Sequence, residues 1–348
     1  MSDLKAKKDL RKLKEKEVFA LIEGLGQPKF RAKQLYDWLW NKSLTNIDDM
    51  SNLPIAMRDA LKEEYKIYPA TTKITQKSKD GTVKMGFELH DKRIIEGVMI
   101  PTDKRATACV SSQVGCTLAC AFCATGMLKR ERNLEAGEIY DQVVALNNVS
   151  IETQGRPLSN IVYMGMGEPL LNYDNVLSSI DKITSPEGLN MSPRRITVST
   201  VGVARGIKRL ADEGKKFNLA LSLHATNDEK RIQIMDVTKS NPLEKVIEAL
   251  QYFYEKTGNK ITFEYILFHE FNDNIEDAKE LVAICKRVPS FVNLIEYNKV
   301  EGVTLNKTTR RRRDAFVDYL EKNGITAKVR ISRGEDIDAA CGQLANKN

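Results

Sequence analysis

The stretch RATACVSSQVGCTLACAFCATG, residues 105–126, decides the fold. It opens on a short apolar run that is typical of a buried strand and continues into a loop of small residues and cysteines. From here to the C-terminus, strand-like runs alternate with amphipathic helical stretches. Strands are expected at 107–111, 160–165, 195–200, 217–223, 261–267, 291–297 and 326–332, and helices at 135–147, 173–183, 205–213, 243–256, 275–286 and 309–322.

This alternation predicts an α/β fold in which helical crossovers join parallel strands with a right-handed sense. Six or seven such units favour a partial (β/α)6 barrel over a two-layer sandwich. In such a barrel the chemistry lies at the C-terminal ends of the strands. The cysteine-rich loop follows the first barrel strand, so we expect it at that mouth.

The residues before the barrel divide into two further parts. Residues 30–65 carry apolar side chains at helical spacing, with a break at 52–54, and predict a small helical domain over 1–70. Its aromatic residues, Tyr36, Trp38 and Trp40, are expected to form its core. Residues 71–104 switch to strands around a turn at 91–92 and form a β linker region that leads into the barrel at 105–348.

The composition is that of a globular protein, with 42% hydrophobic and 29% charged residues in a chain of 348. A net charge of +7 permits an anionic partner. The chain has no apolar run of membrane-spanning length and no signal-peptide pattern, so we expect a cytoplasmic protein without a membrane partner. In a reducing compartment the six cysteines are better candidates for metal binding or catalysis than for structural disulfides.

Three of these cysteines, Cys116, Cys120 and Cys123, lie within eight residues. Zinc usually takes four protein ligands, commonly in two separated pairs, and neither a second pair nor a nearby histidine follows. Three thiolates on a short loop instead suit a [4Fe-4S] cluster whose fourth iron stays open for a ligand. A structural zinc site completed by a remote residue remains the alternative at this point.

This spacing, with an aromatic residue before the last cysteine, resembles the radical S-adenosylmethionine (SAM) superfamily. The resemblance implies one [4Fe-4S] cluster whose open iron is chelated by SAM. A second element, MGMGEP at 164–169, follows the expected strand at 160–165. Its glycines permit close backbone approach, and its carboxylate offers an acceptor to an amino group. It resembles the superfamily's motif for the amino group of SAM.

Six segments together resemble one family, the RlmN dual-specificity RNA methyltransferases of that superfamily. They are ACVSSQVGCTLACAFCATG, MGMGEPLLN, SPRRITVSTVG, LSLHA, NLIEYN and DIDAACGQL, in this order along nearly the whole chain. The resemblance implies methylation of adenine C2 in 23S rRNA and in tRNA, with two SAM molecules used per turnover. It also implies that the helical domain at 1–70 binds RNA.

The resemblance assigns roles to the remaining cysteines. Cys341 takes a methyl group from the first SAM and becomes S-methylcysteine, and the methyl carbon is then joined to adenine in a covalent enzyme–RNA adduct. Cys109 resolves that adduct through a transient disulfide with Cys341. Glu96 matches the family's acceptor of the C2 proton, and Cys109 is a competing base. Cys285, within a helical run, reads as a buried structural thiol.

Contacts to SAM are implied at strand ends, as a ligand at a barrel mouth requires. They fall on Gly167, Glu168, Ser199, Ser222, Leu223, His224 and Asn298. The segment reads NLIEYNKVEG where a proline more often follows the asparagine in the family, which weakens the assignment of that loop.

RNA contacts are expected from basic segments, namely the run from Lys5 to Lys16, the pair Arg194–Arg195 and the block Arg310–Arg313. The implied partners are 23S rRNA, tRNA and an electron donor such as flavodoxin, and we expect a monomer. Two other functions are open: methylation of adenine C8, as in a related branch, and a non-catalytic Fe–S protein that binds RNA or senses redox state. GEPLLN favours the C2 branch, and the pair of Cys109 with DIDAACGQL favours an enzyme.

Overall fold

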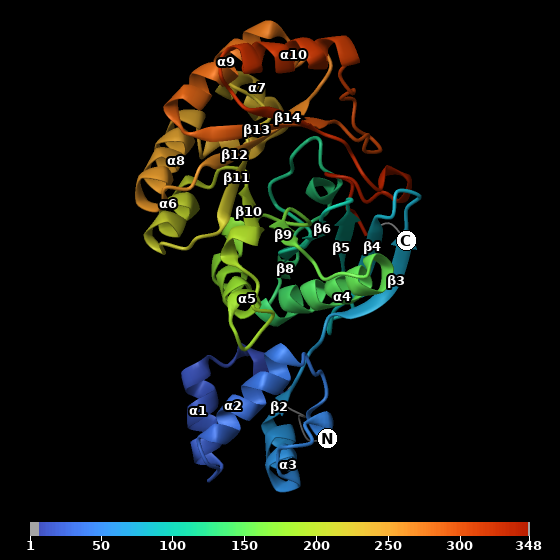
Figure 1. Cartoon of the computed structure of the whole chain (residues 1–348), viewed down its shortest axis with the longest axis vertical. Coiled ribbons are helices and arrows are strands. Elements are labelled where there is room, and N and C mark those ends of the chain that lie inside the picture. The colour runs from blue at the N-terminus through green and yellow to red at the C-terminus, as the bar shows by residue number, and fades with distance from the viewer. Residues whose placement is uncertain (1–6, 347–348) are drawn as a thin grey trace.

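The computed structural model describes residues 7–346 and has two parts, a small helical domain and a large α/β barrel (Figure 1). The helical domain holds α1 (Glu15–Gly24), α2 (Phe30–Tyr36) and α3 (Ile55–Glu64), and a two-stranded pair of β1 (Lys8–Asp9) with β2 (Tyr65–Lys66) closes it. Its helices bury apolar side chains against one another, as the helical spacing of those residues predicted.

The barrel is built on one open sheet, which has ten strands within the described residues. Seven parallel strands agree with the expected ones to within two residues. In spatial order they are β14 (Ala327–Arg330), β13 (Ser290–Glu296), β12 (Ile261–Leu267), β11 (Asn218–Ser222), β10 (Ile196–Thr200), β9 (Asn160–Tyr163) and β6 (Ala106–Cys109). The predicted partial barrel is confirmed.

Residues 71–101 continue the same sheet with antiparallel strands. These are β5 (Ile94–Pro101), β4 (Val83–Glu88) and β3 (Thr71–Lys77). The turn expected at 91–92 is present, with Lys92 in the left-handed region at φ 67°. Because β5 pairs directly with β6, residues from the N-terminal side of the barrel lie beside Cys109.

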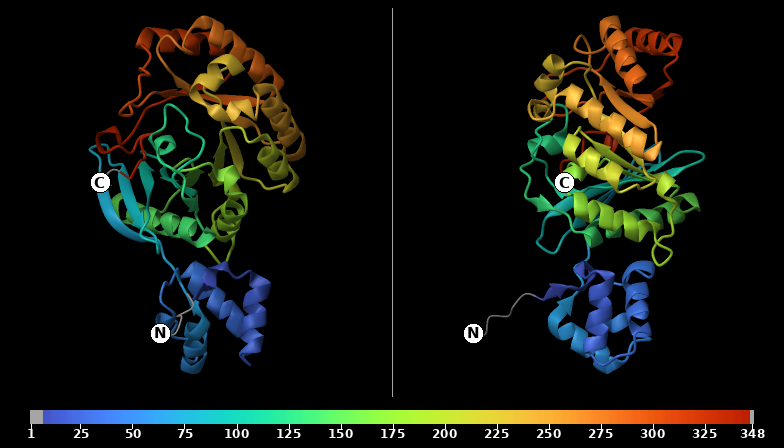
Figure 2. Two further views of the ribbon diagram at one scale, coloured as in Figure 1. Left: turned by 180° about the vertical axis from the view of Figure 1, so that it is seen from behind. Right: turned by 90° about the vertical axis from the view of Figure 1, so that its left-hand side faces the viewer.

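The helices cover the convex face of the sheet and leave its other face to line a concave interior (Figure 2). They are α4 (Ala136–Gln154), α5 (Tyr173–Thr184), α6 (Ala204–Asp212), α8 (Leu243–Thr257), α9 (Ile275–Arg287) and α10 (Arg310–Lys322). Helix α4 runs seven residues beyond the expected end at 147 because its stop signal is Gly155, which caps it at φ 65°. A short helix, α7 (Asp228–Ile234), was not expected.

The helical domain docks on α4 and α5 through buried polar and aromatic contacts. Arg11 Nη1 lies 2.6 Å from Asp141 Oδ1, and both side chains are almost fully buried. The Trp40 and Tyr140 rings meet edge to face at 5.3 Å between centroids. Trp40 therefore joins the two parts of the molecule as well as filling the small domain's core. Within residues 7–346, every helix is too short or too polar to cross a membrane.

Candidate active site

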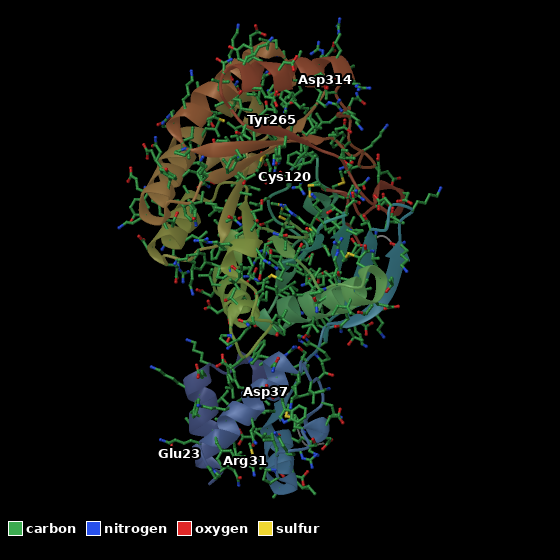
Figure 3. All side chains as sticks on the ribbon, viewed as in Figure 1. Glu23, Arg31, Asp37, Cys120, Tyr265 and Asp314 are labelled. Atoms are coloured by element: carbon green, nitrogen blue, oxygen red, sulfur yellow. The ribbon has the colours of Figure 1, made fainter. Side chains whose placement is uncertain are left out.

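The cysteine loop leaves the C-terminal end of β6 and is closed by a small ribbon of β7 (Gln113–Val114) with β8 (Arg132–Asn133). Two glycines let it fold tightly. A Cβ at Gly115 would lie 2.3 Å from the Lys129 carbonyl oxygen, and one at Gly126 would lie 2.9 Å from that of Cys120. Side chains larger than hydrogen are therefore excluded at both positions. Figure 3 shows Cys120 inside the barrel part of the molecule, away from the helical domain.

The three loop cysteines form one electrostatic group. Burial raises the pKa of each thiol, to about 11 for Cys116, and the charges of Cys116 and Cys123 raise the pKa of Cys120 further. All three thiols are free. Among the described residues, no three His, Cys, Asp or Glu side chains converge as the ligands of a single metal ion would. Three adjacent thiols whose deprotonated forms repel one another fit a cationic group that takes several thiolates at once, and a [4Fe-4S] cluster takes such a donor set.

The glycine-rich motif follows β9 and packs on the start of the cysteine loop. At Gly167, with φ 95°, a Cβ would lie 2.5 Å from Gln113 Cβ. Glu168 is buried, its Oε2 accepts a hydrogen bond from Val201 N at 3.0 Å, and its Oε1 accepts one from Leu170 N at 3.1 Å. Burial raises the pKa of Glu168 to about 7. A ligand amino group beside it would restore the charge that burial disfavours.

Three further predicted SAM residues lie at the ends of β10 and β11. The Ser199 and Ser222 hydroxyls are 3.5 Å apart. His224, with φ 54°, packs its ring on Phe122 of the cysteine loop at 4.8 Å between centroids. Its Nδ1 accepts a hydrogen bond from Ile266 N, and burial lowers its pKa to about 3. The ring is therefore neutral, and its remaining nitrogen is a donor.

Leu223 contributes backbone rather than side chain to this region. Its side chain is buried, its N–H donates to the Glu264 carbonyl at 3.0 Å, and its carbonyl accepts from Arg231 Nε at 3.1 Å. Arg231 is fully buried on α7 and also donates to the Val201 and Ser222 carbonyls. This arginine fixes the ends of β10 and β11 against each other. Residue Ala121 of the cysteine loop donates its N–H to Ile234 on the same helix.

Cys109 and Cys341 come together at this mouth from opposite ends of the barrel sequence. Burial, together with the nearby charge of Cys341, raises the pKa of Cys109 to about 12. Cys341 is open to solvent but sits within the mouth, where desolvation raises its pKa to about 11. Arg330 acts on both thiols and lowers both pKa values. Cys285 is buried in α9 and is separate from this group.

Cys341 belongs to a segment at residues 334–346, here called the C-terminal strap, that contacts the mouth of the barrel. The side-chain amide of Asn298 donates to the Cys341 carbonyl at 3.2 Å. Glu96 does not stand free beside the thiols. Its Oε2 accepts from the backbone N–H groups of Ala345 and Asn346, and its Oε1 lies 3.3 Å from Lys84 Nζ.

Several residues of this site were missed by sequence reasoning. Glu264 and Asn293 pair in register on β12 and β13, share a hydrogen bond of 2.8 Å, and Arg330 Nη1 lies 3.6 Å from Glu264. The sequence signal was Glu264 within the otherwise apolar strand ITFEYIL. A strand buried on both faces accommodates a charged residue only when that charge has a partner. Lys84 in KMGFELH carries the same signal.

The expected RNA-contacting residues do not form one group. Lys5 lies outside the described residues, and Arg11 of the same run is buried in the domain contact. Arg194 and Arg195 precede β10, so they lie at the end of the barrel opposite the cysteines. In the block 310–313, three arginines form ion pairs with carboxylates, namely Arg310, Arg312 and Arg313.

Comparison with known proteins agrees with this geometry. Residues 8–67 match the ribosomal RNA large subunit methyltransferase N-terminal domain, and residues 110–282 match the radical SAM superfamily. A probable dual-specificity RNA methyltransferase RlmN from Christiangramia forsetii is 52% identical over 98% of this chain and 97% of its own length. One from Flavobacterium psychrophilum is 53% identical, with 98% of each chain covered.

A crystal structure of a radical SAM methyltransferase from Sphaerobacter thermophilus superposes with a TM-score of 0.92 at 38% identity. The match covers 98% of this chain and 100% of that one. Both parts of the molecule are therefore shared with known relatives. The chain belongs to the RlmN family of dual-specificity RNA methyltransferases, SAM-dependent enzymes of the radical SAM superfamily that use a [4Fe-4S] cluster.

Proposed function

We propose that this enzyme methylates C2 of one adenosine in the peptidyl transferase centre of 23S rRNA and of the adenosine 3′ of the anticodon in tRNAs. The observation that carries the proposal is the position of Cys341 beside the cysteine loop, where the carbonyl of the next residue, Gly342, accepts from Ala124 N at 2.7 Å and the charge of Cys341 acts on Cys109. Adenine C2 is not nucleophilic, so direct transfer from SAM does not serve. A thiol that first takes the methyl group and a second thiol that later releases it solve that problem.

Cys341 is the methyl acceptor in this proposal. Its thiol loses its proton, and the thiolate attacks the methyl carbon of one SAM, which releases S-adenosylhomocysteine and leaves S-methylcysteine. The positive charge of Arg330 favours the thiolate that this displacement needs. Cys116, Cys120 and Cys123 would hold the cluster, which would supply one electron for the reductive cleavage of a second SAM. A hydrogen atom of the S-methyl group would pass to the 5′-deoxyadenosyl radical released from that SAM, and the resulting carbon radical would add to adenine C2. The adduct would lose the C2 proton and pass one electron back to the oxidised cluster, which leaves the RNA covalently attached to Cys341.

Cys109 resolves that adduct. Its thiolate attacks the Cys341 sulfur and the sulfur–carbon bond breaks with its electron pair passing to the methylene carbon. That carbon takes up a proton and becomes the methyl group of the product, and a disulfide forms between the two cysteines. Desolvation makes this thiolate costly while the site is closed, since burial raises the pKa of Cys109 to about 12. The same burial keeps the thiol away from competing oxidants.

The C2 proton has two candidate acceptors, Glu96 and Cys109. In this structure both oxygens of Glu96 are engaged by Lys84 and by the strap. Glu96 would therefore act as a base only after the strap has moved, whereas Cys109 is already close enough for the charge of Cys341 to act on it. The SAM contacts are proposed at Gly167, Glu168, Ser199, Ser222, Leu223, His224 and Asn298.

We further propose that residues 1–70 bind RNA, that flavodoxin or a similar protein donates the electrons, and that the enzyme acts as a monomer. The target adenine has to leave its base stack before C2 can enter the mouth. The GEPLLN segment after the glycine motif favours the C2 product over the C8 product.

The test is an anaerobic reaction of the reconstituted enzyme with rRNA or tRNA, SAM and a reductant, followed by mass spectrometry of nucleosides. We expect 2-methyladenosine, and 8-methyladenosine in its place would refute the C2 assignment. The Cys109→Ala variant should accumulate a protein–RNA crosslink through Cys341. Cys285→Ala is the matched control because that thiol is buried away from the site, and it should turn over normally.

A further inference from the structure

The C-terminal strap is tied to the rest of the barrel along its whole length. At its start, Gly334 N donates to Asp80 at 2.9 Å, and Asp336 accepts from Ser78 Oγ at 2.6 Å. Around Cys341, the Gly342 carbonyl accepts from Ala124 N at 2.7 Å. Figure 1 shows this red segment running back to the strands at the start of the sheet. The strap therefore joins the β3–β4 hairpin to the cysteine loop.

Two buried side chains, Lys84 and Glu96, hold the strap on both sides of Cys341. Before the cysteine, Lys84 Nζ donates to the Asp338 carbonyl at 3.4 Å. After it, Glu96 Oε2 accepts from Ala345 N at 2.9 Å and from Asn346 N at 3.1 Å. The side-chain amide of Asn346 adds a bond of 2.7 Å to the Ile94 carbonyl on the Glu96 strand.

Lys84 and Glu96 form one buried ion pair. Lys84 and Glu96 are 5% and 3% exposed at their side chains, and 3.3 Å separates Nζ from Oε1. Neither charge has water to replace a lost partner, so removing one leaves the other buried and uncompensated. Lys84 lies opposite Val98, and Val98 lies opposite Cys109, on neighbouring strands. The Lys84–Glu96 pair and Cys109 thus share one stretch of the sheet.

We propose that Lys84 and Glu96 are positioning residues that clamp the strap and hold Cys341 beside Cys109. The proposal rests on the role given to Cys341 above, and it assigns Glu96 a task that needs no proton transfer. With both carboxylate oxygens engaged, Glu96 fixes where the methyl-carrying thiol stands. Its replacement would harm catalysis even if Cys109 alone removed the C2 proton.

The test uses the reconstituted holoenzyme without RNA. Hydrogen exchange of peptides from residues 336–346 and the alkylation rate of Cys341 are measured in Glu96→Gln and Lys84→Met. Both rates should rise at least tenfold. Lys73→Met is the matched control, because Lys73 forms an exposed pair with Glu88 on the same hairpin, and it should leave both rates unchanged.

A truncation after Leu344 distinguishes the clamp from a role of Glu96 as a proton acceptor alone. It removes the amides that Glu96 binds while it leaves the carboxylate and the sheet untouched, so it remains informative if the sheet variants fold poorly. If the clamp exists, the truncated enzyme should show the same increase in hydrogen exchange of the strap and the same loss of methylation as Glu96→Gln. Full turnover by the truncated enzyme, or unchanged strap exchange in Glu96→Gln with accumulated RNA adduct, would overturn the clamp.

Failure of the clamp and failure of the proposed function give different results. If only the clamp is wrong, strap exchange stays at the native rate in every variant while Cys109→Ala still traps RNA on Cys341. If the role of Cys341 is wrong, no crosslink forms in Cys109→Ala whatever the strap does.

Discussion

Replacing Gly167 with alanine tests how the glycine motif positions Glu168. The new Cβ would lie 2.5 Å from Gln113 Cβ and 2.9 Å from Gln113 N, and the backbone stands at φ 95°. Gly155→Ala is the matched control, since Gly155 has φ 65° with nothing within 4 Å of its Cβ position. The control bears backbone strain of ~1–2 kcal/mol. Gly167→Ala adds steric overlap of ~1–3 kcal/mol.

The variants should differ in stability and in SAM affinity. Each kcal/mol lowers Tm by roughly 2–4 °C in a domain of this size, so Gly167→Ala should melt clearly below Gly155→Ala. The loop relieves the overlap by moving, and the moved carboxylate loses a charge-assisted hydrogen bond of ~1.5–3 kcal/mol to the SAM amino group.

The assay is SAM binding to the reconstituted enzyme by calorimetry, together with thermal unfolding. Gly167→Ala should bind SAM about tenfold or more weakly, as that bond energy implies, whereas Gly155→Ala should bind it normally. Equal Tm and equal affinity in the two variants would refute the reasoning, because both share positive φ and only one has the overlap.

Two other predictions follow from buried charges. Because burial raises the pKa of Glu168 to about 7, its charge is present above that pH and lost below it; SAM affinity should fall about tenfold from pH 8 to pH 6. Glu168→Gln should bind more weakly at pH 8 and lack this slope, and an unchanged slope would point to another group. Arg11→Met breaks the buried pair with Asp141 and should cost ~3–5 kcal/mol in urea unfolding. Lys12→Met, which breaks an exposed pair with Glu135, should cost less than ~1 kcal/mol, and equal losses would contradict the docking argument.

The alternation of strands and helices was predictable because each element carries its own periodicity. The strand at 261–267 was placed to the residue, since ITFEYIL is rich in the β-branched and aromatic residues that strands favour. Helix α4 was cut short at 147 because the stretch after it is polar, and only Gly155 marks its end. Helix α7 was missed because seven residues give too few turns for a pattern to stand out.

The cysteines also differ in how much of their arrangement the sequence could predict. Cys116, Cys120 and Cys123 were recognisable together because their spacing is local. The pair of Cys109 and Cys341 came from resemblance, since the contact between them exists only after the sheet has curved and the strap has returned across it. Glu96 shows the limit most clearly: its position in RIIEGVMI says nothing of Lys84 or of the strap amides that occupy its oxygens.

The sequence by itself determined the fold class, the family and the cysteine loop, because periodicity and motif spacing can be recognised within short stretches of the chain. Tertiary structure alone decided which charges meet. The Lys84–Glu96 clamp, the buried Arg231 and the Arg330–Glu264 pair each join residues from different elements. Only the packed barrel removes the water that would otherwise screen those charges.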